Sequence, residues 1–228
     1  MRELEQALRS GLADLALVLD DGQIGLLLDY LALIQKWTQV YNLTAVRDPA
    51  EMLTHHLLDS LAVINPLRRQ LAGLRDQAPG AAAAANVAKL RLLDVGSGAG
   101  LPGVVIAICC PEIAVDCVDT VAKKVAFIRQ VAATLKLANL HGLHARVESL
   151  ADPYRVICSR AFASLADFTR LSSVALAPQG FWLAMKAKDP ADEVAALPAT
   201  VNVFHVEQLV VPGLDADRCI VWMRQSAQ

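Results

Sequence analysis

The sequence predicts an α/β protein with a doubly wound, mainly parallel sheet and an N-terminal set of helices. Three observations indicate this fold: helical periodicity over residues 1–72, alternation of short apolar runs with helical stretches after residue 90, and a glycine-rich loop after the first apolar run. The 228 residues suit one domain with some extra elements. We expect a helical extension and linker over 1–89 and a Rossmann-like domain over 90–228, packed as one compact unit.

The N-terminal part contains two clear helix signals. Apolar residues recur at three- and four-residue steps along one helix face, at Ile24, Leu27, Leu28, Leu31 and Ile34. The run Asp48-Pro49-Ala50-Glu51 places a capping aspartate before a proline at the first helical position and a glutamate where a capping box has one. We expect this helix to extend to Asn65 and to end at Pro66. Residues 73–89 include Pro79-Gly80 and the alanine run Ala81–Ala85, and they indicate a linker or an insertion.

The second part alternates between strands and helices. We expect strands at 90–95, 114–118, 142–147, 155–159, 181–186, 201–209 and 219–224. Helices are expected at 102–110, 121–137, 165–176 and 190–197. This alternation predicts parallel strands covered on both faces. The loop between the last two strands is too short for a helical crossover, so these two are expected to pair antiparallel.

Composition excludes several classes of protein. A hydrophobic fraction of 55% and a mean hydropathy of +0.40 exclude disorder. The longest uncharged run, between Asp94 and Glu112, is interrupted by glycines and prolines, so no membrane span is expected. A charged N-terminus without a signal sequence, and five cysteines without a C-x-x-C pair, favour reduced thiols in the cytoplasm and no metal site. The 21 basic and 23 acidic residues exclude a generic, charge-driven nucleic-acid binder.

The most informative segment runs from Asp94 to Gly103 and reads Asp-Val-Gly-Ser-Gly-Ala-Gly-Leu-Pro-Gly. A glycine loop between a strand and a helix is where open α/β sheets bind nucleotide-like ligands. The spacing Gly96-x-Gly98-x-Gly100 differs from the Gly-x-Gly-x-x-Gly of dinucleotide sites, because residue 101 is leucine, and no P-loop lysine follows. The pattern favours S-adenosylmethionine, whose ammonium group an acid such as Asp94 suits. A dinucleotide site and a turn without ligand remain as alternatives.

A second signal for this ligand is Asp119, at the end of the next apolar run and twenty-one residues after Gly98. A carboxylate at this separation can accept hydrogen bonds from both hydroxyls of an adenosine ribose. The acid occurs at this place in both dinucleotide and S-adenosylmethionine sites, so it supports an adenosine ligand without choosing between them.

Several segments together resemble one family. They are Trp37-Thr-Gln-Val-Tyr-Asn-Leu-Thr44, Arg47-Asp-Pro49, His56-Leu-Leu-Asp-Ser60, Gly96-Ser-Gly-Ala-Gly-Leu-Pro-Gly103 and Ser159-Arg-Ala-Phe-Ala-Ser164. In this order, over roughly residues 20–225, the chain resembles the RsmG (GidB) family of bacterial small-subunit ribosomal RNA guanine-N7 methyltransferases. The resemblance implies a class I S-adenosylmethionine-dependent methyltransferase, cytoplasmic and monomeric, that acts on 16S ribosomal RNA in the small subunit.

The resemblance also implies roles for single residues. S-adenosylmethionine would contact Gly96, Gly98, Gly100, Leu101, Asp119, Val147, Glu148 and Arg160. The RNA side would include Arg160, Lys186, Lys123, Lys124, Asn42 and Arg47. From the residues alone, Glu148 is equally an exposed loop carboxylate, and Arg160 equally a partner in a structural ion pair. His55 and His56 are more often structural than catalytic at such positions.

A local basic segment fits an RNA partner. Residues 120–147 contain five basic side chains and no acidic one: Lys123, Lys124, Arg129, Lys136 and Arg146. Arg129 and Lys136 are expected on one helix face. A solvated helix face is the alternative to phosphate contacts.

The chemistry implied by the resemblance needs no catalytic base. The lone pair of guanine N7 is free at neutral pH, so positioning and electrostatics are expected to dominate. The sequence has no Pro-Cys nucleophile pair, and Asp152-Pro153-Tyr154 lacks one proline of the motif used on exocyclic amines. Two other functions stay open: a small-molecule methyltransferase and a non-catalytic RNA-binding assembly factor.

Overall fold

The computed structural model describes residues 2–76, 90–162, 164–187 and 189–226. The predicted alanine-rich linker therefore lies outside the described residues. The N-terminal part is helical, as the sequence predicts. Its elements are α1 (Arg2–Asp14), α2 (Asp21–Tyr41), α3 (Pro49–Met52), a π-helical segment (Leu53–Leu58), α4 (Asp59–Leu61) and α5 (Ile64–Asp76).

The helix starts follow from local chemistry. Asp20 and Gln23 form a capping box at the start of α2. The side chain of Asp48 accepts hydrogen bonds from the N–H groups of Ala50 and Glu51, which confirms the predicted start of α3. The predicted stop at Pro66 is wrong. The chain turns before Ile64, and Pro66 lies in the first turn of α5, where its missing N–H needs no partner.

The sheet has seven strands in the order β3-β2-β1-β4-β5-β7-β6. Their bounds are β1 Arg91–Val95, β2 Ala114–Asp119, β3 Leu140–His144, β4 Tyr154–Ser159, β5 Leu176–Lys186, β6 Val201–Leu209 and β7 Arg218–Gln225. Strands β1 to β5 are parallel to one another, whereas β7 is antiparallel to both β5 and β6. The parallel strands and the antiparallel pairing of β6 with β7 were predicted, whereas the pairing of β7 with β5 was not. The strand order reverses between β1 and β4, so a crevice is expected beyond their carboxyl ends.

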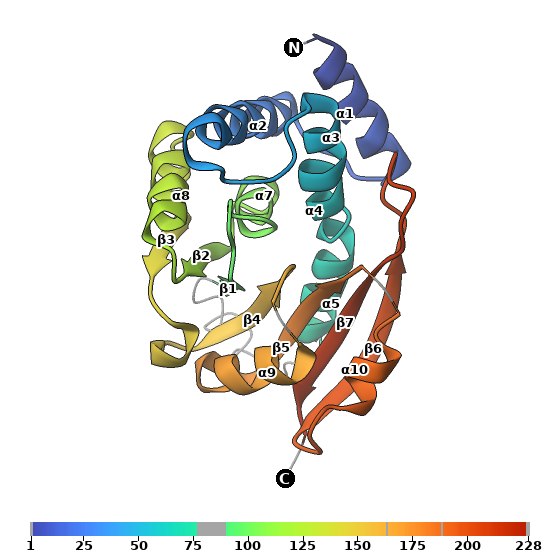
Figure 1. Cartoon of the computed structure of the whole chain (residues 1–228). Coiled ribbons are helices and arrows are strands. Elements are labelled where there is room, and N and C mark those ends of the chain that lie inside the picture. Colours follow the sequence, from blue (N-terminus) through green and yellow to red (C-terminus); the bar gives the residue numbers. More distant parts are fainter. Residues whose placement is uncertain (1, 77–89, 163, 188, 227–228) are drawn as a thin grey trace.

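Helices cover both faces of the sheet. In Figure 1, α7 (Gly103–Cys109) and α8 (Ala122–Thr134) lie on one side together with α2, and α9 (Leu165–Ser172) and α10 (Ala191–Ala195) lie on the other. The larger core cluster contains residues of both the N-terminal helices and the sheet domain, such as Leu27, Val105 and Phe127. The smaller cluster on the other face includes Phe168 and Trp182.

Two sequence predictions need correction near β3. The strand expected at 142–147 is β3 at Leu140–His144, and Val147–Ser149 form a short 3₁₀ turn instead. The helix expected at 121–137 ends at Thr134, and Lys136 adopts a left-handed backbone with φ of 55°. Arg129 and Lys136 therefore do not share a helix face.

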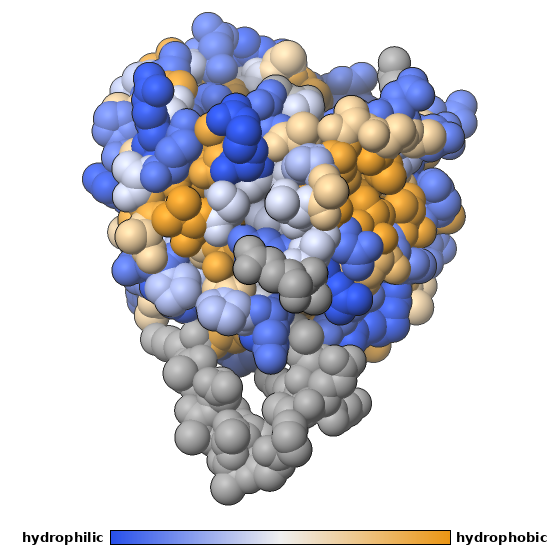
Figure 2. All heavy atoms as spheres, turned by 90° about the horizontal axis from the view of Figure 1, so that it is seen from below, coloured by the Kyte–Doolittle hydropathy of each residue, from blue (hydrophilic) through white to orange (hydrophobic). Residues whose placement is uncertain are grey.

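The cysteines and the surface bear on the features that the composition predicts. All five cysteines are buried. Among the described residues, no helix has the length and apolar content needed to cross a membrane. Seen from below, the molecule carries hydrophilic residues between separate hydrophobic areas (Figure 2).

Candidate functional site

The predicted site residues of the sheet domain gather at one edge. Because β1 to β5 are parallel, their carboxyl ends lie at the same edge of the sheet. The residues at or just after these ends are Gly96, Asp119, Val147, Arg160 and Lys186, in strand order. The register places Val95 beside Val118 and Asp94 beside Cys158. The strands that lead to Gly96, Asp119 and Arg160 therefore end next to one another.

The glycine loop combines an exposed side and a buried side. Gly96 and Gly98 have φ of 66° and 59°, and no atom of another segment lies within 4 Å of a Cβ built on Gly98. Gly100 is buried, and a Cβ there would approach Val104 Cγ2 to 2.4 Å. Leu101 is also buried. The loop thus presents bare backbone outward at Gly98, which suits close approach of a ligand, while Gly100 and Leu101 support it from inside.

Asp119 ties the glycine loop to the start of α8. Its Oδ2 accepts a hydrogen bond of 3.1 Å from the N–H of Gly98, and its Oδ1 accepts one of 2.8 Å from the N–H of Val121. Nζ of Lys124 lies 3.6 Å from Oδ2. A carboxylate has about four acceptor sites. After these three contacts, acceptor capacity remains for a ligand hydroxyl.

Asp94 lies fully buried beneath the loop. Its Oδ2 accepts a hydrogen bond of 2.9 Å from the N–H of Gly103, at the start of α7. No nitrogen or hydroxyl donor of the described residues reaches its buried Oδ1. Burial raises the pKa of Asp94 to about 7, although the Gly103 N–H and the charge of Arg160 act in the opposite direction. A carboxyl group whose pKa is raised to about 7 therefore lies directly beneath the glycine loop.

Arg160 takes part in an ion network with the N-terminal helices. Its Nη1 donates to Oδ2 of Asp59 at 2.9 Å and to the carbonyl of His55 at 2.7 Å. Nε of Arg218, from β7, donates to Oδ1 of Asp59 at 2.9 Å. The Asp59 side chain is only 4% exposed, and that of Arg160 is 24% exposed. The structural ion pair that the sequence analysis gave as one alternative for Arg160 is therefore present, with Asp59 as its partner. Part of the Arg160 side chain remains exposed.

Sequence reasoning assigned no role to Asp59 and did not consider Arg218 or Tyr30. Asp59 lies within the segment His56-Leu-Leu-Asp-Ser60, but the pattern gave no partner for it. The Tyr30 hydroxyl is buried and donates a hydrogen bond of 2.7 Å to the carbonyl of Ala99, inside the glycine loop. A tyrosine on an apolar helix face gives no sign in the sequence of such a distant partner.

Lys186 and the turn after β3 complete the edge. Nζ of Lys186 lies 2.8 Å from Oε2 of Glu193, which also accepts from the N–H of Leu165. Burial opposes ionisation of Glu193, yet these two hydrogen bonds keep its pKa below the usual value. Val147 is buried in the smaller core cluster, while Glu148 is exposed.

The N-terminal candidates lie in a compact turn after α2. The guanidinium of Arg47 donates from Nη1 to the carbonyl of Thr38 at 2.9 Å and from Nη2 to Oδ1 of Asn42. Asn42 itself caps α2 with φ of 49°. His56 is buried with Nε2 2.9 Å from Oγ1 of Thr44, while its Nδ1 has no hydrogen-bonding partner among the described residues. Burial, then the charge of Arg160, lowers the pKa of His56 to about 4.

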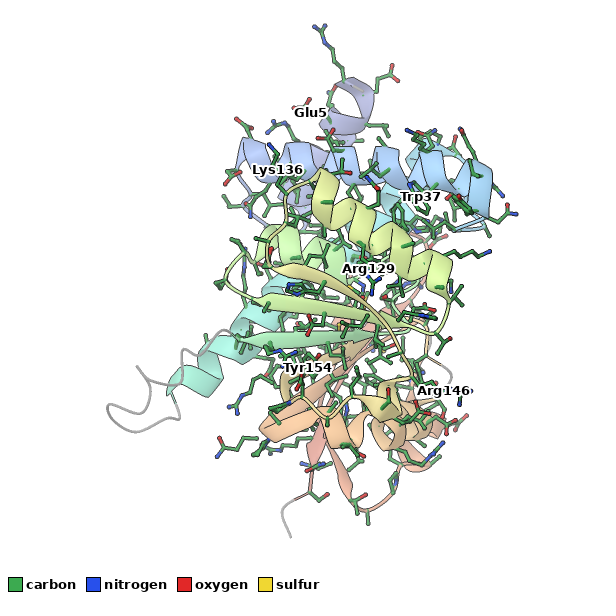
Figure 3. All side chains as sticks on the ribbon, turned by 90° about the vertical axis from the view of Figure 1, so that its left-hand side faces the viewer. Glu5, Trp37, Arg129, Lys136, Arg146 and Tyr154 are labelled. Atoms are coloured by element: carbon green, nitrogen blue, oxygen red, sulfur yellow. The ribbon has the colours of Figure 1, made fainter. Side chains whose placement is uncertain are left out.

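The basic segment separates into two ends of the molecule. Figure 3 shows Arg146 and Trp37 on one side and Lys136 and Tyr154 on the other. Tyr154 begins β4 and Arg146 follows β3, so the first side is the carboxyl edge. Arg129 donates to the carbonyl of Gly142, which fixes it against β3. Within the described residues, no group of three His, Cys, Asp or Glu side chains is arranged to hold a metal ion.

The single reversed strand β7 between β5 and β6, with a glycine loop after β1 and an acid after β2, defines the class I S-adenosylmethionine-dependent methyltransferase fold. Residues 23–221 match the model of the family described as GidB, rRNA small subunit methyltransferase G, and the chain belongs to that family.

Curated relatives agree over the whole chain. A protein of Albidiferax ferrireducens named ribosomal RNA small subunit methyltransferase G is 88% identical over 100% of both chains. A protein of Polaromonas sp. with the same name is 68% identical over 98% of this chain and 95% of its own. Among solved structures, TrmN from Thermus thermophilus has a TM-score of 0.51 at 20% identity, over 69% of this chain and 48% of that one. This last likeness concerns the fold alone.

Proposed function

We propose that the protein transfers the methyl group of S-adenosylmethionine to N7 of a guanine in the 16S ribosomal RNA of the small subunit. Family membership over residues 23–221 and the names of the relatives support this proposal. The structural observation on which the proposal depends is the hydrogen bond from the N–H of Gly98 to Asp119. It joins the glycine loop to the carboxylate that we assign to the ribose, at the carboxyl edge of the sheet.

The residues of this edge fit the proposed cofactor. Open space in front of Gly98 admits a ligand against the backbone, and Asp119 retains acceptor capacity for a ribose hydroxyl. Asp94 lies buried beneath the loop and accepts a hydrogen bond from the N–H of Gly103, so it supports the loop from below. In the same assignment, Val147 and Glu148 border the adenine. Gly96, Gly100 and Leu101 shape the loop, and Arg160 lies where cofactor and substrate meet.

When bound, S-adenosylmethionine supplies an electrophilic methyl group on a sulfonium. Because guanine N7 is already unprotonated, no side chain is assigned as a catalytic base. The chain's own residues hold and align the two reactants, a contribution that reaches roughly 7–11 kcal/mol in well-oriented systems. Arg160 is held by Asp59, and Lys186 by Glu193, so both cations stand in fixed positions beside the edge. Fixed charges cost no reorganisation during the reaction.

On the RNA side, Asn42, Arg47, Lys123 and Lys124 are assigned to backbone contacts near the carboxyl edge. We further propose that residues 1–89 and 90–228 fold as one unit, and that the protein acts as a cytoplasmic monomer. The shared core cluster and the hydrogen bond from Tyr30 to Ala99 support the single unit. Light scattering with size-exclusion chromatography tests the monomer.

Tritiated methyl transfer tests the function. Purified small subunits, naked 16S RNA and a panel of small molecules are offered separately, and labelled RNA is cleaved chemically at N7-methylguanine. Label at guanine N7 in subunits or RNA is expected. Label confined to small molecules would support the small-molecule alternative. RNA binding without label in any acceptor would support the assembly factor.

Charge reversal provides a second test with a matched control. Lys123→Glu should weaken RNA binding and reduce its salt dependence, since a phosphate contact is lost. Lys136→Glu makes the same change of charge at the opposite side of the molecule (Figure 3) and should leave RNA affinity unchanged. Equal losses in both variants would contradict the assignment of Lys123 to the RNA side.

A further inference from the structure

An exposed aromatic ring ends α2. Tyr41 is 45% exposed, and the other large apolar side chains that are exposed in the described part of the chain are valines. Its ring centroid lies 5.0 Å from that of Trp37, which in turn lies 5.2 Å from that of Phe127 on α8. A row of three rings thus leads from the core to the surface and fixes the orientation of Tyr41.

This ring lies toward the carboxyl edge. Trp37 is on the same side as Arg146 in Figure 3, and Tyr41 is one helical turn further along α2. On α8, Lys123 and Lys124 precede Phe127 by four and three residues, so they share its helix face one turn nearer the edge. Lys124 reaches Asp119, the proposed ribose ligand.

A fixed cation stands beside the ring. Arg47 is exposed, and its guanidinium bonds to the carbonyl of Thr38 and to the side chain of Asn42, three residues before Tyr41 and one residue after it. The neighbouring carboxylate of Asp48 is engaged with two backbone N–H groups of α3. The surface next to Tyr41 therefore combines an aromatic face with positive charge.

The chemistry of the reaction selects an unpaired nucleotide as the occupant. In A-form RNA, N7 of guanine faces a deep and narrow major groove that side chains do not enter. A guanine whose N7 is methylated is therefore accessible when it lies outside a helix, and its neighbours in such a loop are unpaired too. Unpaired bases stack on aromatic side chains, while phosphates bind adjacent cations.

We propose that Tyr41 is a stacking platform for an unpaired base of the RNA substrate, next to the methylated guanine, with Arg47 contacting its phosphate. This inference rests on the proposed function, because it specifies how the same site grips its RNA. Trp37 acts behind the platform as a positioning residue. Tyr41 contributes to RNA affinity and does not contribute to cofactor binding.

Substitutions at Tyr41 test the platform. Tyr41→Leu keeps apolar packing against Trp37 but removes the aromatic face, and it should raise the KM for small subunits or 16S RNA about tenfold. Tyr41→Phe retains the ring and should keep the wild-type KM. Val40→Ala, at a neighbouring side chain that is 70% exposed, is the control. The Kd for S-adenosylmethionine should be equal in all four proteins.

The outcomes separate the two proposals. If wild type labels RNA and Tyr41→Leu has an unchanged KM, the platform is refuted while the proposed function stands. If wild type labels no RNA, the proposed function itself fails. If Tyr41→Phe loses affinity as strongly as Tyr41→Leu, the hydroxyl rather than the ring face makes the contact, and stacking is refuted.

Discussion

Nη1 of Arg160 donates a hydrogen bond of 2.9 Å to Oδ2 of Asp59, although the two residues are 101 positions apart in the chain. The π-helical segment before Asp59 adds the carbonyl of His55 as a second acceptor for the same nitrogen. The N-terminal helices thus set the position of an arginine that follows β4 of the sheet. This contact leads to the first prediction.

Asp59→Asn should lower the free energy of unfolding by about 3–5 kcal/mol, because it removes the buried charge between two guanidinium groups. Urea denaturation measures the change. Asp14→Asn, at an exposed position where no described residue forms a side-chain hydrogen bond with Asp14, is the matched control and should change stability by about 0.5 kcal/mol or less. Equal midpoints for the two variants would show that the network contributes little.

Asp119→Ala should weaken S-adenosylmethionine binding about tenfold or more, since hydrogen bonds to charged groups contribute roughly 1.5–3 kcal/mol. Lys124→Met removes the cation beside the same carboxylate but keeps the acceptor, and it should have a smaller effect. Isothermal titration calorimetry gives both values, with thermal melting as a check of folding. An unchanged Kd in Asp119→Ala would mean that the ribose binds elsewhere.

Two glycines of one loop should respond differently to alanine. Gly98→Ala meets no atom of another segment and pays only for its positive φ, about 1–2 kcal/mol, so the protein should fold but bind cofactor poorly. Gly100→Ala meets Val104 at 2.4 Å and should destabilise the fold itself. Thermal melting together with calorimetry distinguishes the two. A folded Gly98→Ala with wild-type cofactor affinity would argue against a ligand at this backbone.

Stability should depend on pH through Asp94. Its pKa is raised by burial from 3.8 to about 7, so the folded state holds a proton that the unfolded chain has released. The stability from this proton is present below about pH 4 and is lost as pH rises to about 7.

Relative to Asp94→Asn, wild type should therefore lose roughly 2–3 kcal/mol between pH 5 and pH 8. Urea denaturation at the two pH values measures this difference. A wild-type curve parallel to that of Asp94→Asn would mean that Asp94 is ionised throughout.

The order of helices and strands could be predicted because hydrophobic periodicity, helix caps and glycines between elements are local signals in the sequence. The strand at 201–209 matches β6 throughout, and the start at Asp48 is correct. The stop at Pro66 was wrong because a proline ends one helix and equally begins another, and only packing decides which. The strand after α8 was predicted to begin two residues too late and to extend to Val147, since Val147 continues the alternation of Leu143 and Ala145, which the 3₁₀ turn interrupts.

The site was predictable where residues adjoin strand ends, and unpredictable where distant segments meet. Glycine spacing and the separation of Asp119 are linear features, so the sequence could associate the loop with Asp119, and the structure joins them by a hydrogen bond. Asp59 and Tyr30 act on residues 101 and 69 positions away. A single sequence carries no periodic signal for such pairs. For the same reason, Arg129 was expected on one helix face with Lys136, whereas α8 ends at Thr134 and Arg129 bonds to the backbone of β3.

The ribosome makes the members of the charge network around Asp59 at different times. Arg218 lies 159 residues after Asp59, in the last strand of the sheet. At about 5–20 residues per second, the ribosome makes these two residues roughly 8–30 s apart. Because Arg160 precedes Arg218 in the chain, the Asp59 carboxylate can have both arginine partners only after Arg218 has been made. The charge network around Asp59 is therefore complete only once β7 has been made and has paired with β5, so the full set of contacts that holds Arg160 forms late in synthesis.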